Sequence, residues 1–256
     1  MEATKAQGSI AALTAVVLFL SLWLPLGQLA FMTQHWMKVG TFAALFLLLG
    51  YAATASRAPS LSDPVFMSMV LLLAYIAHQF EEHWVDLLGN EYAFYSYVNG
   101  LVRSIAGVAD ESLTPLTPQG IYVINTSLVW LVGVTAMVRS KYHLFPAMAM
   151  SAIALVNGIT HILGGLLAVA YNPGLLTSVL LFVPLPMAFY QRLIRRQPAL
   201  RKQVIGSMIW AVLAHVLMVG GMLAANLFNV IPEELYFGLL IGWSAVPMAL
   251  FRGATG

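Results

Sequence analysis

Long apolar segments alternate along the chain with short polar connections. Eight of these segments approach or exceed the roughly 20 apolar residues that an α-helix needs to cross a bilayer. The predicted spans are Ser9–Phe31, Val39–Ser56, Pro64–Leu88, Gln119–Val138, Leu144–Tyr171, Gly174–Gln191, Gln203–Phe228 and Glu234–Phe251. The pattern therefore predicts an all-α bundle of eight transmembrane helices without a β-sheet.

Basic residues in the connections predict the orientation of the bundle, because loops rich in Lys and Arg stay in the cytoplasm. With both termini cytoplasmic, only Lys38 and Arg103 of the 12 basic residues lie outside. The inner residues are Lys5, Arg57, Arg139, Lys141, Arg192, Arg195, Arg196, Arg201, Lys202 and Arg252. An odd number of spans would divide these basic loops between the two sides, so the distribution favours eight.

The composition agrees with a single integral-membrane domain over residues 1–256. Hydrophobic residues make up 60% of the chain and charged residues 9%, whereas soluble domains carry about 25% charged residues. Membrane lipid is therefore the expected surrounding. A net charge of +2 without a basic stretch argues against nucleic acid as a partner. The absence of cysteine excludes disulfides and thiolate metal sites.

One connection, Gly89–Pro118 on the outer side, is much longer than the others. It contains polar residues together with the aromatic residues Tyr92, Phe94, Tyr95 and Tyr97. Long ordered loops are often functional, which predicts an interfacial helix or a lid. The alternative is an aromatic belt segment at the lipid headgroups.

The third predicted span contains the segment His78-Gln-Phe-Glu81-Glu82-His83. A carboxylate at the centre of a spanning helix costs about 2.5–3.5 kcal/mol, so such residues face the bundle interior and have a function. His78 and Glu82 are one helical turn apart, and Glu81 lies on the other flank of His78. His83 is expected to point away from His78.

Other polar residues occur at a similar depth in later spans. Asn157 and His161 are one turn apart in the fifth span, and His215 lies in the seventh. At a rise of 1.5 Å per residue, the three imidazoles of His78, His161 and His215 fall within about 8 Å of one another in depth. Asn125 reaches a similar level from the outer side. If these helices are neighbours, a polar cluster forms in the outer half of the membrane.

Imidazole and carboxylate ligands together indicate a divalent transition metal, either zinc or iron. The predicted ligands are His78, Glu82, His161 and His215. Glu81 is then the general base beside the ion, and Asn157 orients His161 or the substrate. The alternative for His215 is a hydrogen-bonded packing residue, and for Asn125 a helix-to-helix contact.

The predicted function is a membrane-embedded, metal-dependent enzyme that acts on a lipid-like or apolar substrate. Hydrolysis is the simplest chemistry for one metal with an adjacent Glu. A non-haem iron oxygenase is the alternative among enzymes. A transporter that couples ions through Glu81 and Glu82 is the alternative from another class, and a structural protein is a third.

The motif resembles the signature of the HXXEE-motif family, bacterial membrane proteins of unknown function. That family also has a later Asn-x-x-x-His pair and a Tyr-x-Pro-Gly-Leu segment, matched here by Asn157/His161 and by Tyr171-Asn-Pro-Gly-Leu175. The three motifs occur in order over about Ser60–Arg195. The resemblance implies that His78, Glu81, Glu82, Asn157 and His161 are functional positions and that the location is a bacterial inner membrane. It implies no particular activity.

Overall fold

The computed structural model describes residues 2–54 and 60–249, and in this part of the chain the protein is helical without strands. Among the described residues, six helices are long and apolar enough to cross a membrane, as the sequence predicts for a membrane protein. They span Ala30–Ala53, Pro64–His83, Pro118–Arg139, Phe145–Ala168, Leu175–Arg196 and Pro198–Leu227.

The first and last predicted spans also form helices, but they are not among these six. The N-terminal helix consists of α1 (Glu2–Leu18), a π-helical turn (Phe19–Trp23) and α2 (Leu24–Leu26), and its apolar part is Ile10–Leu26. The last helix is α12 (Glu233–Ala249). Eight membrane crossings therefore remain a prediction. The predicted ends at Ser56 and Phe251, like Arg57 and Arg252, lie outside the described residues.

Several predicted boundaries differ from the structure. The second span begins in α3 (Ala30–Thr54), nine residues before the predicted Val39, because the chain turns at Gly27 rather than beyond Phe31. The helix α4 (Pro64–His83) ends before the predicted Leu88. The helix α8 (Phe145–Ala168) ends before Tyr171, at Val169 in a left-handed conformation with φ of 49°.

The early end of α4 results from a turn that Asp86 stabilises. Its Oδ1 accepts hydrogen bonds from the backbone amides of Leu88 (2.9 Å) and Asn90 (2.8 Å), and its Oδ2 accepts one from the Asn90 side chain. Burial alone would raise the pKa of Asp86, but these hydrogen bonds outweigh it and lower the pKa. Asp86 therefore shapes the connection and does not extend the acidic face of α4.

The buried helix α8 organises the bundle. It packs against α4, α7 (Val132–Arg139), α10 (Pro184–Arg196) and α11 (Arg201–Met222). Its first half is buried from Phe145 to Leu155, whereas Leu163 and Leu167 near its end are exposed. Exposed apolar side chains of this kind face lipid in a membrane protein.

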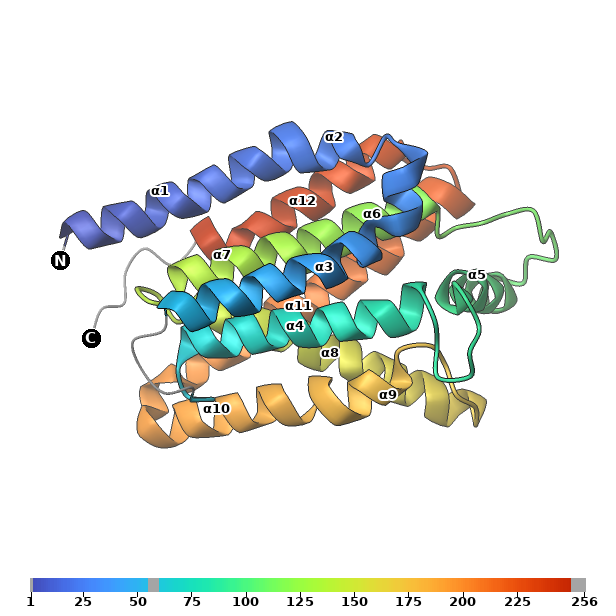
Figure 1. The fold of residues 1–256 in the computed structure, drawn as a ribbon. Coiled ribbons are helices and arrows are strands. Elements are labelled where there is room, and N and C mark those ends of the chain that lie inside the picture. The colour runs from blue at the N-terminus through green and yellow to red at the C-terminus, as the bar shows by residue number, and fades with distance from the viewer. Residues whose placement is uncertain (1, 55–59, 250–256) are drawn as a thin grey trace.

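Consecutive long helices alternate in direction (Figure 1). The connections between α7 and α8 and between α10 and α11 lie at the left end of Figure 1, and we call this end the basic end. The described residues there include Arg139, Lys141, Arg196, Arg201 and Lys202. The start of α1 and the end of α12 lie at the same end of the bundle.

The long connection between α4 and α6 (Pro118–Ile124) contains a helix, α5 (Ala93–Ala106). It lies at the opposite end from the basic end and is seen along its own axis, so it runs across the bundle (Figure 1). Asn99 ties it to the chain that follows, because its amide donates to the Leu116 carbonyl (3.0 Å) and its Oδ1 accepts from the Leu116 amide (2.8 Å). Arg103 donates to the Leu113 carbonyl.

The basic end is expected to face the cytoplasm, because Lys and Arg resist translocation. Reporter fusions after Ser140 and after Arg196 should both report cytoplasm, and a fusion after Gly107 should report the opposite side. A cytoplasmic signal from Gly107, or an external one from Arg196, would contradict this orientation.

Candidate metal centre

The last turns of α4 carry the polar motif into the interior of the bundle. Asp63 caps the start of this helix by accepting from the amides of Val65 and Phe66, and Pro64 occupies its first turn. At its other end, His78, Glu81 and Glu82 are all buried, with exposed fractions of 0%, 6% and 5%. A buried carboxylate requires a compensating partner.

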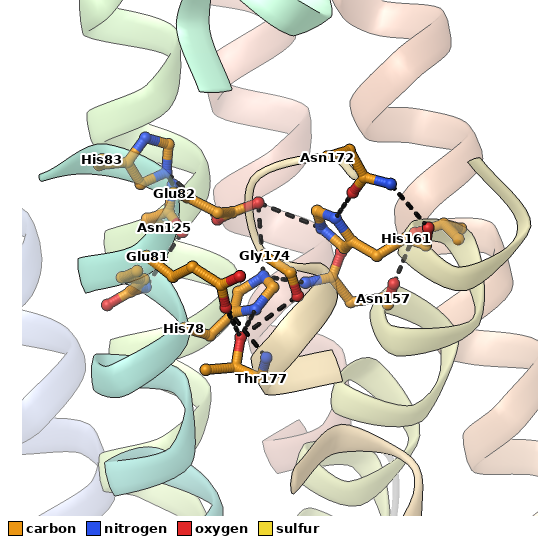
Figure 2. A network of polar contacts seen from close by, with 12 residues as sticks. His78, Glu81, Glu82, His83, Asn125, Asn157, His161, Asn172, Gly174 and Thr177 are labelled. Atoms are coloured by element: carbon orange, nitrogen blue, oxygen red, sulfur yellow. Dashed lines mark hydrogen bonds and ion pairs between the residues drawn. The ribbon is translucent and has the colours of Figure 1, made fainter. Parts of the chain in front are cut away.

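Glu82 lies between imidazoles from two helices. Its Oε1 is 3.4 Å from His78 Nε2 and 3.1 Å from His161 Nε2 on α8. One possible ligand atom from each of these three residues lies within 4.8 Å of the other two. The rings of His78 and His161 are 4.9 Å apart and nearly perpendicular. Figure 2 shows the two imidazoles converging on the Glu82 carboxylate.

Hydrogen bonds on the far side of each ring fix the tautomers. His78 Nδ1 is 2.7 Å from the Thr177 hydroxyl, which itself donates to Glu81 Oε2 at 2.6 Å, so Nδ1 is the donor. His161 Nδ1 is 2.8 Å from Asn172 Oδ1, while the Asn172 amide donates to the His161 carbonyl. Both Nε2 atoms therefore carry their lone pairs toward Glu82, as in histidines that bind a metal.

Glu81 performs a different task from Glu82. Its Oε1 accepts from the Tyr171 hydroxyl (2.9 Å) and the Leu176 amide (3.1 Å), and its Oε2 accepts from the amide and hydroxyl of Thr177. It thereby holds the start of the helix formed by α9 (Leu175–Thr177), a π-helical turn (Ser178–Phe182) and α10. A carboxylate suits the positive end of a helix. The role of general base that the sequence predicts for Glu81 stays a prediction.

The connection between α8 and α9 folds back against the cluster and passes close to both imidazoles (Figure 2). Its Gly174 has a φ of 93°, and a Cβ there would come within 2.6 Å of His78 and 2.8 Å of His161. Only glycine fits this position, because it adopts the left-handed backbone conformation without strain and has no Cβ to meet the two rings.

The structure places the other predicted residues around the cluster in different ways. The Asn157 amide lies 3.1 Å from His78 Nε2, so it contacts His78 rather than the predicted His161. His215 is not part of the three-residue cluster, and its Nδ1 lies 2.8 Å from the Ala211 carbonyl of its own helix. Asn125 joins neighbouring helices, since it accepts from the Gln79 amide at 3.0 Å.

His83 contacts the cluster although sequence reasoning gave it no role. Its Nε2 is 3.3 Å from Glu82 Oε2 and 3.3 Å from the Asn125 amide. Trp130 donates to Gln79 at 2.8 Å and extends this network into the bundle. Asn172 and Thr177 were also missed. The signal that could have found them was the Pro173-Gly174 break between two spans, which is flanked by these polar residues.

A cavity of about 340 Å³ adjoins the cluster. Its polar lining residues include Glu82, Asn125, Asn157, His161 and Asn172, which the contacts above connect into one patch. His215 also lines this cavity. The remaining wall is built mostly of apolar side chains from α5, α6, α8 and α11 and from the π-helical segment Asn125–Leu131.

Fold and site together define a helical membrane protein with a buried His/Glu cluster beside an apolar cavity. Residues 69–190, just under half of the chain, match the family model described as a protein of unknown function with an HXXEE motif. The segment that contains His78, Glu82 and His161 is therefore similar to this HXXEE family. Comparisons with curated proteins and with solved structures give no match.

Gly174→Ala should destabilise the protein, because the new methyl group meets two buried imidazoles at a strained backbone position. We expect a loss of about 1–3 kcal/mol, measured by thermal unfolding in detergent. Gly220→Ala is the matched control, since a Cβ there meets no atom within 4 Å and alanine favours the helix. Equal stability of the two variants would show that Gly174 does not lie in close contact with the two imidazoles.

Proposed function

We propose that the protein is a membrane-embedded, metal-dependent enzyme that acts on a lipid-like or apolar substrate. The observation that carries this proposal is the convergence of three lone-pair donors, His78 Nε2, His161 Nε2 and Glu82 Oε1, at a buried position. Three acceptors facing one another require a cation between them or a proton on one of them.

The donor set fits a divalent transition metal. Two imidazoles and one carboxylate are a common ligand set of catalytic zinc, which keeps a further position open. The same set with several open positions occurs in non-haem iron enzymes. Thr177 and Asn172 hold the far nitrogens of both rings, as the outer partners of metal-binding histidines do. The cavity reaches the cluster through Glu82, His161 and Asn157.

A metal held by these residues would supply Lewis acidity, which lowers the pKa of a coordinated water and polarises a carbonyl or phosphoryl group. The chain's own residues then bind and orient the substrate. Asn157 lines the cavity and its amide lies 3.1 Å from His78 Nε2. A cation bound at His78 Nε2 would replace this contact, and the amide could then hold a substrate oxygen beside the ligands. Glu81 acts on His78 through Thr177 and is a positioning residue.

Hydrolysis is the reaction class that we favour for this site, and oxidation by iron is the alternative with the same ligands. A proton-coupled transporter is the rival from another class, because a carboxylate among imidazoles also holds a proton. The expected location is a bacterial inner membrane with the basic end in the cytoplasm. The content of bound metal distinguishes the enzyme from the transporter.

Protein purified without a histidine tag should contain about one transition-metal ion per chain, as a three-ligand protein site holds. Glu82→Gln and His161→Ala should each lose it, whereas His215→Ala should retain it, because His215 lies outside the cluster. His35→Ala is a control for the removal of an unrelated imidazole. Elemental analysis measures these contents. Less than about a tenth of an ion in wild type, unchanged in the variants, would remove the metal proposal.

The two adjacent carboxylates should respond differently to neutralisation. Glu82→Gln removes a ligand and should abolish metal binding. Glu81→Gln keeps all three ligands but loses the bonds that position Thr177, so its metal affinity should fall by about 10–100-fold. Titration against a competing chelator measures both, with Glu91→Gln in the connection after α4 as the control. Equal, complete loss in Glu81→Gln would instead make Glu81 a ligand.

A further inference from the structure

The wall of the cavity next to the cluster has one polar patch around Glu82 and His161 and is mostly apolar elsewhere. Val98 and Val102 of α5, Ile153 of α8, and Met218 and Met222 of α11 are among its lining residues. A cavity of this kind favours hydrocarbon, because burial of apolar surface is the main driving force for binding there. The polar patch around Glu82 and His161 fits the head of the same molecule.

Four residues that line the cavity are also exposed at the surface of the protein, and one of them is the polar Thr160 of α8. Leu101 and Ile105 of α5 have exposed fractions of 43% and 79%, and Val219 of α11 has 44%. Residues that share both properties mark the mouth of a cavity. Three of these four side chains are apolar and belong to α5 and α11, which suits an opening toward lipid between those two helices.

The volume of the cavity limits what it holds. At about 340 Å³, it is near the lower end of the range of about 300–1,000 Å³ found for small-molecule sites. This is suited to one hydrocarbon chain with a small head and too small for the two chains of a phospholipid.

We propose that the cavity binds a single-chain lipid with an oxygen-bearing head, which enters sideways from the bilayer between α5 and α11. The placement of the head at Glu82 and His161 rests on the proposed function, whereas the placement of the chain rests on the cavity alone. The methionines Met218 and Met222 adapt to different chains, because their side chains are flexible and polarisable. They lie outside the residues 69–190 that match the family model.

A photoreactive palmitic acid with a diazirine in its chain tests this site on the purified full-length protein. Mass spectrometry should find the label in peptides from α5 and α11, and excess palmitic acid should remove it. Excess dioleoyl phosphatidylcholine should not. Labelling that is spread over the exposed apolar helices, or that the phospholipid removes equally well, would overturn the proposal.

Val219→Trp places a large ring in the mouth and should reduce the specific labelling about tenfold or more, the equivalent of a typical overpacking cost. Val216→Trp is the matched control, because Val216 lies on the same helix, is 61% exposed and does not line the cavity. Unchanged labelling in Val219→Trp would contradict the position of the mouth. If that variant does not fold, the competed labelling of wild type decides the result.

Metal content measured on the same samples separates this inference from the proposed function. Competed labelling in protein without metal supports the chain site and removes the metalloenzyme. Bound metal without competed labelling supports the metal centre and removes the single-chain lipid.

Discussion

The buried carboxylate of Glu82 lies at the centre of the polar interior of the bundle, and the surrounding helices must supply groups that balance its charge. In a membrane protein this group cannot be hydrated by bulk water, so its charge must be balanced by partners within the bundle. His78 supplies one from the same helix and His161 another from α8, while His83 faces the second oxygen. The packing of α4 against α8 therefore buries apolar side chains and also brings His161 to the Glu82 carboxylate.

The chain between α8 and α9 completes this arrangement. It brings Asn172 to His161 and Thr177 to His78, and Gly174 allows it to pass close to both rings. Glu81 holds the same segment in place by accepting hydrogen bonds from backbone amides at the start of α9. The two neighbouring carboxylates thus have different contacts. Glu82 contacts the imidazoles of the cluster, and Glu81 contacts the backbone that carries Thr177. Two π-helical segments, Asn125–Leu131 and Ser178–Phe182, begin at or next to residues of this polar network. Such segments are frequent at functional sites.

Hydrophobic length and periodicity predicted the helices and their order, because in lipid the backbone must satisfy its own hydrogen bonds. The helical spacing of His78 and Glu82, and the depth of His161, also predicted the cluster. The hydrogen-bond partners of Glu81 were not predictable in this way, since Tyr171 and Thr177 are some 90 residues away in the chain and no local pattern indicates the contact. The contact between His83 and Glu82 was not predicted, because one oxygen of Glu82 lies near His78 and the other near His83. The depth argument for His215 was sound as far as the shared cavity, but depth does not determine the direction of a side chain.

X-ray absorption spectroscopy of the untagged protein with its bound metal tests the central claim most directly, because it reports the atoms around the ion. The spectrum should show two imidazole nitrogens and oxygen ligands at about 2.0–2.2 Å and no sulfur. One imidazole or none, or a sulfur ligand from methionine, would contradict a metal centre built from His78, Glu82 and His161.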